Sequence, residues 1–275
     1  MPEGPEAHTI ARKLNEVITG KYIVGYSVIS KGEILSLDGL TFQNKIKSVS
    51  AHGKRPIFTL ETGYIVTFLA MNGRWSFTPD ASSTFQLILS DNANINESAF
   101  IIEDDYTSIY YSGRGKSGHV KYLKDDRSLL DYFKNFGPDM LVSSITEQEY
   151  IDRAKLTVPS NMIVAEFLLE QKYFSGVGNY LRCDIMYLCR LKPNRQMGSL
   201  SDIDFSNLYR YTKERMGISY NNGGLTMRDY WDPYGAKGVY PKIIYMEKMD
   251  TFGNKVENEV IGKDRRVYWV PSIQF

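Results

Sequence analysis

The chain has 275 residues, 43% of them hydrophobic and 24% charged, with a formal net charge of +1. This length suits two domains, and the composition is that of a globular protein. No apolar run approaches the roughly 20 residues of a membrane span, and the N-terminus shows no signal pattern, so we expect a soluble intracellular protein. Because Lys and Arg are scattered, nucleic-acid binding must be argued from local groups.

Cysteine and histidine are scarce. Cys183 and Cys189 fall in one segment of helical pattern and project from different faces of it. His8, His52 and His119 are far apart in the sequence. We therefore predict no disulfide between the two cysteines, no zinc site and no cofactor.

The first six residues, Met1-Pro2-Glu3-Gly4-Pro5-Glu6, combine an amine with two carboxylates. We expect the methionine to be removed because the next residue is small, which leaves the secondary amine of Pro2 as the terminus. An α-amine has a pKa of about 7.7–8.0, so part of it is unprotonated and nucleophilic at neutral pH. With Glu3 and Glu6 to shuttle protons, this amine suits Schiff-base chemistry. The alternative is that Pro5 opens a helix whose positive end the two carboxylates favour.

Residues 5–17 carry apolar side chains at spacings of three and four, which predicts an amphipathic helix that ends at Gly20. From Tyr22 to Tyr111 the pattern changes to short β-rich runs separated by Gly, Asn and Asp. Such runs predict an antiparallel sandwich or barrel. The predicted strands are Tyr22–Ile29, Ile46–Val49, Ile57–Leu60, Tyr64–Leu69, Phe85–Leu89 and Ser108–Tyr111.

Two turns between these strands carry candidate functional side chains. Gly53-Lys54-Arg55 places two cations on a glycine turn, and Ala70-Met71-Asn72-Gly73-Arg74 places a methionine and an arginine on another. The alternative is that Lys54 and Arg55 are solvated loop charges and that Met71 belongs to the core.

Phe136-Gly137-Pro138-Asp139 ends the strand pattern, and helical spacing follows. Within the helical region, Gly176-Val177-Gly178-Asn179 exposes backbone N–H groups at the start of a helix, which favours a phosphate site. The predicted helices are Tyr150–Ala154, Met162–Leu169 (capped by Ser160 or Asn161), Tyr180–Cys189 and Ser206–Met216.

After Asn221 the sequence is rich in loops. Two β-like stretches, Ile243–Met246 and Val267–Val270, predict a small hairpin with turns at Gly253-Asn254 and Gly262. The alternative is a solvated ribbon. The hairpin carries three cations: Lys263, Arg265 and Arg266.

Together these segments resemble the formamidopyrimidine-DNA glycosylase / endonuclease VIII family of base-excision repair enzymes. The resemblance covers most of the chain, with its parts in the same order. The run from Leu168 to Tyr180 resembles the helix–two-turn–helix signature of the family. The other matching parts are MPEGPE at residues 1–6, Gly53-Lys54, and Phe136-Gly137-Pro138-Asp139.

The resemblance implies an α+β fold with two domains. An N-terminal antiparallel β-sandwich flanked by helices would occupy residues 1–135, and a helical helix–two-turn–helix domain residues 136–220. Residues 221–275 would form a lesion loop and a β-hairpin finger. The expected partner is double-stranded DNA that contains oxidised bases or abasic sites, bound by a monomer.

The resemblance also implies a mechanism. The damaged nucleotide is flipped out of the duplex, and the Pro2 nitrogen attacks its C1′ to displace the base. Glu3 assists ring opening and proton transfer with Glu6 in support, and β,δ-elimination from the Schiff base then cuts the strand. Lys54 counts as both a catalytic and a phosphate-binding residue. The residues expected to contact DNA are Lys54, Met71, Arg114, Lys116, Asn179 and Arg265, with Arg266 as the alternative to Arg265.

Three departures from the family pattern bear on function. Most members hold the finger with a four-cysteine zinc site, but Val270-Pro271-Ser272-Ile273 stands where the last cysteine pair would be, which resembles the zincless members. Residues 113–117 lack the aromatic wedge that fills the gap left by the flipped base, so Met71 would carry more of that work. Gly4 resembles the endonuclease VIII members, which implies oxidised pyrimidines as substrates. The segment GGLTMRDY at residues 223–230 instead resembles the glycosylases of oxidised purines.

The function predicted first is therefore a bifunctional DNA glycosylase and abasic-site lyase. The alternative, motivated by the missing wedge and the near-neutral charge, is a catalytically silent protein that binds damaged DNA on the same fold. Strand scission of damaged DNA by protein that begins at Pro2 distinguishes the two.

Overall fold

The computed structural model describes most of the chain, which divides into two compact units. One unit comprises Met1–Lys134 and Asn222–Val239, and the other Asn135–Asn221 and Tyr240–Phe275. Among the described residues, no helix is both long enough and apolar enough to span a membrane. The described stretches are residues 2–30, 34–70, 73–93, 106–113, 118–226, 230–262 and 265–275.

The first unit is built on a nine-stranded sheet with the order β2-β9-β5-β4-β3-β1-β7-β8-β6. Its ladders are antiparallel except for the parallel pair of β2 and β9. All six predicted strands are present with adjusted ends, whereas β2, β6 and β9 were not predicted. The strands are β1 (Tyr22–Val28), β2 (Ile34–Ser36), β3 (Asn44–His52), β4 (Arg55–Leu60), β5 (Tyr64–Phe68), β6 (Arg74–Ser76), β7 (Ser83–Ser90), β8 (Tyr106–Ser112) and β9 (His119–Leu123).

This sheet folds over on itself. β4 and β6 are five positions apart in the strand order, which would separate them by about 24 Å in a flat sheet. The ring centroids of Phe58 in β4 and Trp75 in β6 nevertheless lie 5.2 Å apart. The two halves of the sheet therefore face each other, which confirms the predicted sandwich.

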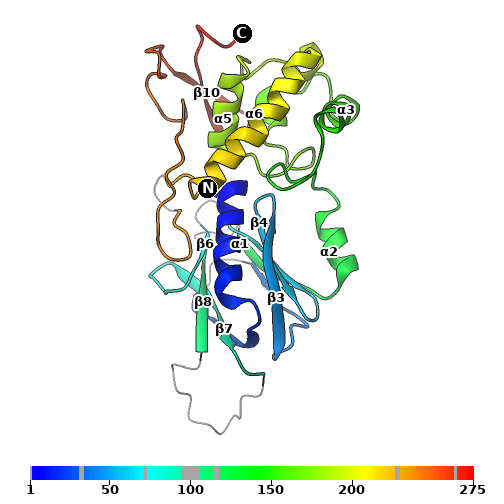
Figure 1. The fold of residues 1–275 in the computed structure, drawn as a ribbon, viewed down its shortest axis with the longest axis vertical. Coiled ribbons are helices and arrows are strands. Elements are labelled where there is room, and N and C mark those ends of the chain that lie inside the picture. The colour runs from blue at the N-terminus through cyan, green and yellow to red at the C-terminus, as the bar shows by residue number, and fades with distance from the viewer. Residues whose placement is uncertain are drawn as a thin grey trace. The chain divides into compact units, whose positions relative to one another are not determined.

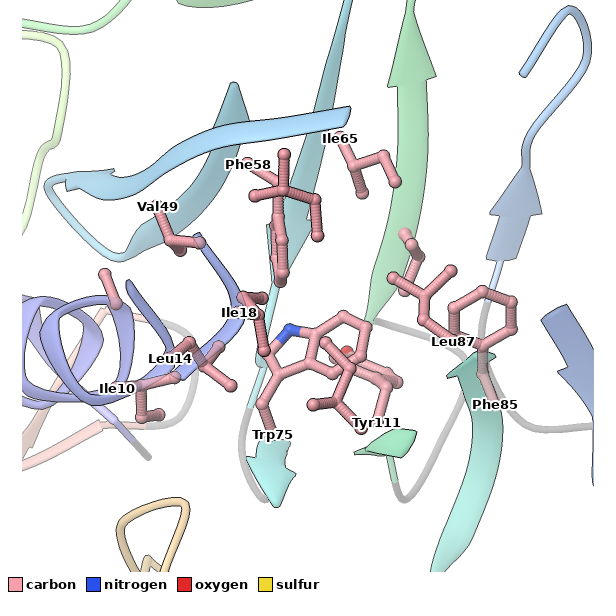
Figure 2. Close-up of a cluster of buried hydrophobic side chains, with 14 of the residues drawn as sticks. Ile10, Leu14, Ile18, Val49, Phe58, Ile65, Trp75, Phe85, Leu87 and Tyr111 are labelled. Atoms are coloured by element: carbon pink, nitrogen blue, oxygen red, sulfur yellow. The ribbon is translucent and has the colours of Figure 1, made fainter. Parts of the chain in front are cut away.

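Helix α1 (Gly4–Ile18) packs against β3 and β4 and covers the core of this unit (Figure 1). Its apolar face follows the predicted helical spacing, and Ile10, Leu14 and Ile18 are fully buried. Figure 2 shows Leu14 and Ile18 pointing from the helix toward the indole of Trp75. The indole N–H donates to the Thr67 hydroxyl at 3.3 Å, so this large buried side chain keeps its hydrogen bond. Burial of this face fixes the start of α1 to the sandwich.

Helix α2 (Asp126–Phe133) follows β9 and was not predicted from the sequence. Its N-cap is Asp125, whose carboxylate accepts the backbone N–H of Ser128 at 2.8 Å. No residue of the helix is fully buried. Its attachment to the sheet is a small apolar cluster: Ile57, Val66 and Leu123, with Tyr64, Leu129, Tyr132 and Phe133 packed against them.

A chain of three polar side chains also fastens α2 to the sheet. Arg55 Nε donates to the Tyr132 hydroxyl at 3.1 Å, and this hydroxyl lies 2.6 Å from His119 Nε2. Because arginine can only donate, the hydroxyl accepts from Arg55 and has its own proton to give to Nε2. This assignment makes His119 a neutral imidazole protonated on Nδ1. Burial, followed by the positive charges of Arg55 and Lys121, lowers the pKa of His119 to about 4, which agrees with the neutral form.

The second unit is helical, as predicted, but one helix differs from expectation. The segment Met162–Leu169 contains only α4 (Val164–Phe167), which begins after Ile163 without a side-chain cap, so the predicted caps Ser160 and Asn161 were wrong. The first N–H groups of α4 donate instead to the carbonyls of Pro193 and Arg195. The helices are α3 (Glu147–Thr157), α4, α5 (Asn179–Leu188), α6 (Asp202–Asn221) and the short 3-10 helix η2 (Met197–Ser199).

Helix α5 holds the C-terminal segment of this unit through Asp184, which is fully buried. The Asp184 carboxylate accepts the backbone N–H groups of Ile243 and Ile244 at 3.0 Å each and the Tyr240 hydroxyl at 2.9 Å. Burial raises the pKa of Asp184, while these hydrogen bonds and the charge of Arg215 at 3.9 Å oppose the rise. Because these N–H groups bind Asp184, the predicted strand Ile243–Met246 was wrong.

The C-terminal hairpin consists of β10 (Glu257–Ile261) and β11 (Arg265–Trp269). The turn at Gly262 and the second strand agree with prediction, but the first strand lies later in the sequence than expected. The contacts of this region with α5 include the Tyr187 hydroxyl, which donates to Asp250 at 2.9 Å, and Cys183 Sγ, which accepts the N–H of Tyr268 at 3.4 Å. Cys183 and Cys189 are both buried, and they form no disulfide with each other.

Residues 222–239 belong to the first unit, although the sequence suggested a separate segment from residue 221. The Leu225–Val239 bridge closes this segment. The limits 1–135, 136–220 and 221–275 as functional divisions stay a prediction.

We expect His119 to make stability depend on pH. Its folded pKa of about 4 lies below the ordinary 6.5, so between these values the unfolded chain binds the proton more readily. The free energy of unfolding should therefore fall as the pH falls from about 6.5 to about 4. Urea denaturation across this range should show a shallower fall for His119→Gln than for the parent chain. Carboxylate contributions are common to both proteins, and equal slopes would contradict the assignment.

Candidate functional site

The start of α1 brings the N-terminal candidates together. Pro2 and Glu3 are buried immediately before the helix, and Pro5 lies in its first turn. Glu3 is the N-cap residue and forms a capping box with Glu6. In this box Glu6 Oε2 accepts the backbone N–H of Glu3 at 2.7 Å. The alternative interpretation of the sequence was that the two carboxylates stabilise the start of the helix. The capping box shows that Glu6 does so.

The second oxygen of Glu6 binds a distant segment. Glu6 Oε1 accepts the backbone N–H of Leu225 at 2.6 Å, and the Glu6 side chain is fully buried. The approach requires Gly224, whose φ is +86° and where a Cβ would lie 2.5 Å from Glu6 Cγ. Since both oxygens of Glu6 accept backbone N–H groups, the carboxylate fixes Glu3 and the 222–239 segment relative to each other.

Residues 222–239 are tied to α1 at further points. Lys13 forms an ion pair with Asp232, whose Oδ1 also accepts the N–H groups of Tyr234 and Ala236 at 2.9 Å each. Tyr230 is buried, and this burial, together with the carboxylates of Glu6 and Asp232, raises its pKa well above the usual value. These contacts were not predicted from the sequence. The Asp232-Pro233-Tyr234-Gly235 turn was the signal that could have indicated an anchored loop.

Lys54 occupies the turn between β3 and β4. Gly53 has a φ of +56°, which lets the chain reverse within two residues. Lys54 is only 6% exposed, and Arg55 is largely buried with its guanidinium 3.9 Å from the ring centroid of Phe68. Burial lowers the pKa of Arg55, opposed by its hydrogen bond with Tyr132. The alternative that both are solvated loop charges was therefore wrong.

In the second unit, Asn179 is the first residue of α5, after the N-cap Gly178. The loop before it is held by Gln171, which accepts the N–H of Gly176 at 3.0 Å and donates to the carbonyl of Val177 at 3.1 Å. The N-cap residue, Gly178, has no side chain with which to cap the helix, and the positive end of a helix favours an anion. Asn179 Nδ2 donates to the carbonyl of Arg266 at 3.1 Å. The predicted phosphate loop and the hairpin thus meet at the start of α5.

Arg265 and Arg266 open strand β11 and are both exposed. Successive residues of a strand point to opposite faces, so the two guanidinium groups cannot serve one anion from the same face. Arg265, with Arg266 as its alternative, stays the predicted phosphate ligand of the hairpin. Three other predicted DNA-contact residues, Met71, Arg114 and Lys116, lie outside the described part of the chain.

The four-cysteine zinc site that the resemblance implies for most family members does not fit this chain. Val270, at the position of a cysteine ligand, is fully buried. Among the described residues no three His, Cys, Asp or Glu side chains are grouped to hold a metal ion. The contacts of the hairpin described above come from Asn179, Cys183 and Tyr187 of α5.

Comparison with known proteins points to one family. Residues 1–103 match the family described as Formamidopyrimidine-DNA glycosylase N-terminal domain. The formamidopyrimidine-DNA glycosylase of Listeria monocytogenes serovar 1/2a is 26% identical over 95% of this chain and 92% of its own length. The enzyme of the same name from Zymomonas mobilis is 26% identical over 87% of this chain and 86% of its own length.

Solved structures share the whole fold. The MutM (Fpg) protein from Thermus thermophilus aligns with a TM-score of 0.84 and 24% identity, covering 99% of this chain and 98% of that chain. A Lactococcus lactis Fpg mutant in complex with Fapy-dG containing DNA aligns with a TM-score of 0.82 and 20% identity, covering 99% of both chains. The matched N-terminal domain, the relatives and the fold thus agree in their similarity to formamidopyrimidine-DNA glycosylases.

Proposed function

We propose that the protein is a bifunctional DNA glycosylase and abasic-site lyase that removes oxidised bases through a Schiff base on Pro2. The observation that carries this proposal is the start of α1, where Pro2 and Glu3 are buried and Glu6 is fixed by two backbone donors. The relatives named formamidopyrimidine-DNA glycosylase support the glycosylase activity. The Lactococcus lactis complexes with Fapy-dG containing DNA and with abasic-site DNA support damaged DNA as the partner.

In the proposed reaction, the lone pair of the Pro2 nitrogen forms a bond to C1′ of the damaged nucleotide. The glycosidic bond breaks, and its electron pair leaves with the base, which takes up the proton that the Pro2 nitrogen loses. Glu3 gives a proton to the ring oxygen as the sugar opens, leaving an iminium between Pro2 and C1′. The iminium makes the C2′ proton acidic, and its removal expels the 3′ phosphate. A second elimination expels the 5′ phosphate, and water releases the remnant from Pro2.

This chemistry requires a free Pro2 nitrogen. A proline nitrogen in a peptide bond is a tertiary amide, whose lone pair is delocalised into the carbonyl. Removal of Met1 is therefore part of the proposal.

Glu6 contributes by position. Its two oxygens already accept the N–H groups of Glu3 and Leu225, so it orients the residue that precedes the helix. Glu3 is then the carboxylate assigned to proton transfer. Lys54, the start of α5 with Asn179, and Arg265 or Arg266 are assigned to backbone phosphates, which position the DNA without reading its sequence.

The first prediction concerns the covalent intermediate. Protein shown by mass spectrometry to begin at Pro2 should give a borohydride-trapped adduct with a duplex that contains one abasic site, because reduction fixes the iminium. The same chain with an acetylated Pro2 nitrogen is the control and should give none. If free-terminus protein binds the duplex but yields neither adduct nor strand scission, the catalytic assignment fails and a silent damage-binding protein remains.

A second prediction isolates the contact between Gly224 and Glu6. Gly224→Ala should slow trapping about tenfold or more, because the added Cβ would displace the Glu6 side chain. Gly223→Ala is a matched control, since Gly223 also has a positive φ (+71°) but its Cβ would meet only Gly238 Cα at 3.6 Å. Both variants carry similar backbone strain, of about 1–2 kcal/mol. Equal trapping rates in the two variants would show that the Glu6 contact does not support the reaction.

A third prediction concerns phosphate binding. Lys54→Ala should weaken binding to duplexes of any sequence alike and reduce the slope of log K against log salt by about 0.9, the value for one lost phosphate contact. Lys155→Ala, which removes a cation paired with Asp202 on the surface, is the charge control. Fluorescence anisotropy over a salt series measures both quantities. A loss confined to one base sequence would contradict the phosphate role.

A further inference from the structure

The turn that carries Lys54 is held from both sides by one helix. His52 and Arg55 are paired in the register of β3 and β4, with Gly53 and Lys54 between them. The ring centroid of His52 lies 5.0 Å from that of Phe133 in an edge-to-face arrangement. Arg55 Nε donates to the Tyr132 hydroxyl. Consecutive residues at the end of α2 thus contact the two residues that flank the turn.

The Tyr132 contact is directional. Its hydroxyl accepts from Arg55 at 3.1 Å and lies 2.6 Å from His119 Nε2 on β9. The ring of Phe68, at 3.9 Å from the Arg55 guanidinium carbon, supports the guanidinium from β5. The side chain of Arg55 is therefore oriented by a hydrogen bond and by an aromatic face from two further elements.

This orientation bears directly on Lys54, because Arg55 is the next residue and the turn has only two residues. A shift of the Arg55 backbone would change the φ and ψ angles of Gly53 and Lys54, because these two residues alone lie between Arg55 and its strand partner His52. Helix α2 has no fully buried residue of its own, so it needs specific contacts to hold its place. The ring of Tyr132 packs against the apolar cluster, while its hydroxyl contacts Arg55 and His119. Substitution by phenylalanine removes the hydroxyl contacts and keeps the ring.

We propose that Tyr132 is a positioning residue for Lys54, acting through Arg55 to orient the turn that presents the lysine to a DNA phosphate. The inference rests on the proposed function, since it assumes that Lys54 binds phosphate. It assigns a role in DNA binding to a helix that none of the predicted site residues occupies.

The test uses Tyr132→Phe, which keeps the ring and removes the hydroxyl. Affinity for a duplex with a tetrahydrofuran abasic-site analogue should fall about 3- to 10-fold, and the salt slope should decrease toward that of Lys54→Ala. In the Lys54→Ala background, Tyr132→Phe should change neither quantity, because the group that it positions is absent. Thermal melting of each variant confirms that the chain is folded.

Tyr64→Phe is a matched control. The Tyr64 hydroxyl also connects the sheet to α2, by donating to Asp126 Oδ1 at 2.5 Å at the other end of the helix. Loss of this hydroxyl should leave affinity and salt slope unchanged. Arg55→Lys provides a second test, since it keeps a positive charge but lacks the Nε donor, and it should also lose its effect when Lys54 is Ala.

The outcomes separate the inference from the proposed function. If Lys54→Ala weakens binding but Tyr132→Phe does not, or if Tyr132→Phe weakens binding equally in both backgrounds, the positioning role is wrong and the phosphate role of Lys54 stands. An effect of Tyr64→Phe as large as that of Tyr132→Phe would also overturn it, since general loosening of α2 would then explain the result. If Lys54→Ala changes neither affinity nor salt slope, the phosphate assignment falls, and the inference with it.

Discussion

The buried carboxylate of Glu6 accepts one hydrogen bond from the start of its own helix and another from Leu225, 219 residues further along the chain. Removing a carboxylate from water costs several kcal/mol unless its oxygens are satisfied. Both segments must therefore meet at this point for the first unit to be stable. The same contact fixes the backbone immediately after Pro2, so the energetic requirement of one buried charge defines where the proposed nucleophile lies.

Much of the fold follows from local sequence patterns. The spacing of Ile10, Leu14 and Ile18 gives α1 because a helix needs one continuous apolar face. Six strands were recognisable as β-rich runs separated by Gly, Asn and Asp. β2 and β6 have three residues each, too few to show a period, and α2 buries no complete side chain, so its pattern is weak. The wrong strand at Ile243–Met246 has a different cause, because Asp184, 59 residues from Ile243, binds N–H groups that a local pattern assigns to a ladder.

The candidate site likewise contains residues that local sequence indicates and contacts that depend on distant parts of the chain. Pro2, Glu3 and Glu6 were predictable as a group because they are neighbours in sequence, and the helix start keeps them together. Lys54 was recognised from its glycine turn. Its supports come from Tyr132, Phe133 and His119, which no spacing rule connects to residue 54. Leu225 takes part through its backbone N–H, and the sequence indicated only that two glycines precede it.

The attachment of the hairpin to α5 has a consequence for how the second unit loses its structure. A zinc-bound finger can be released by a chelator and restored by returning the metal. Here the described anchors are Asn179, Cys183 and Tyr187 of a single helix, together with Asp184 beneath the segment before the hairpin. These α5 contacts all depend on the helix staying folded. Unwinding of α5 would remove the helix start and the finger in one cooperative step.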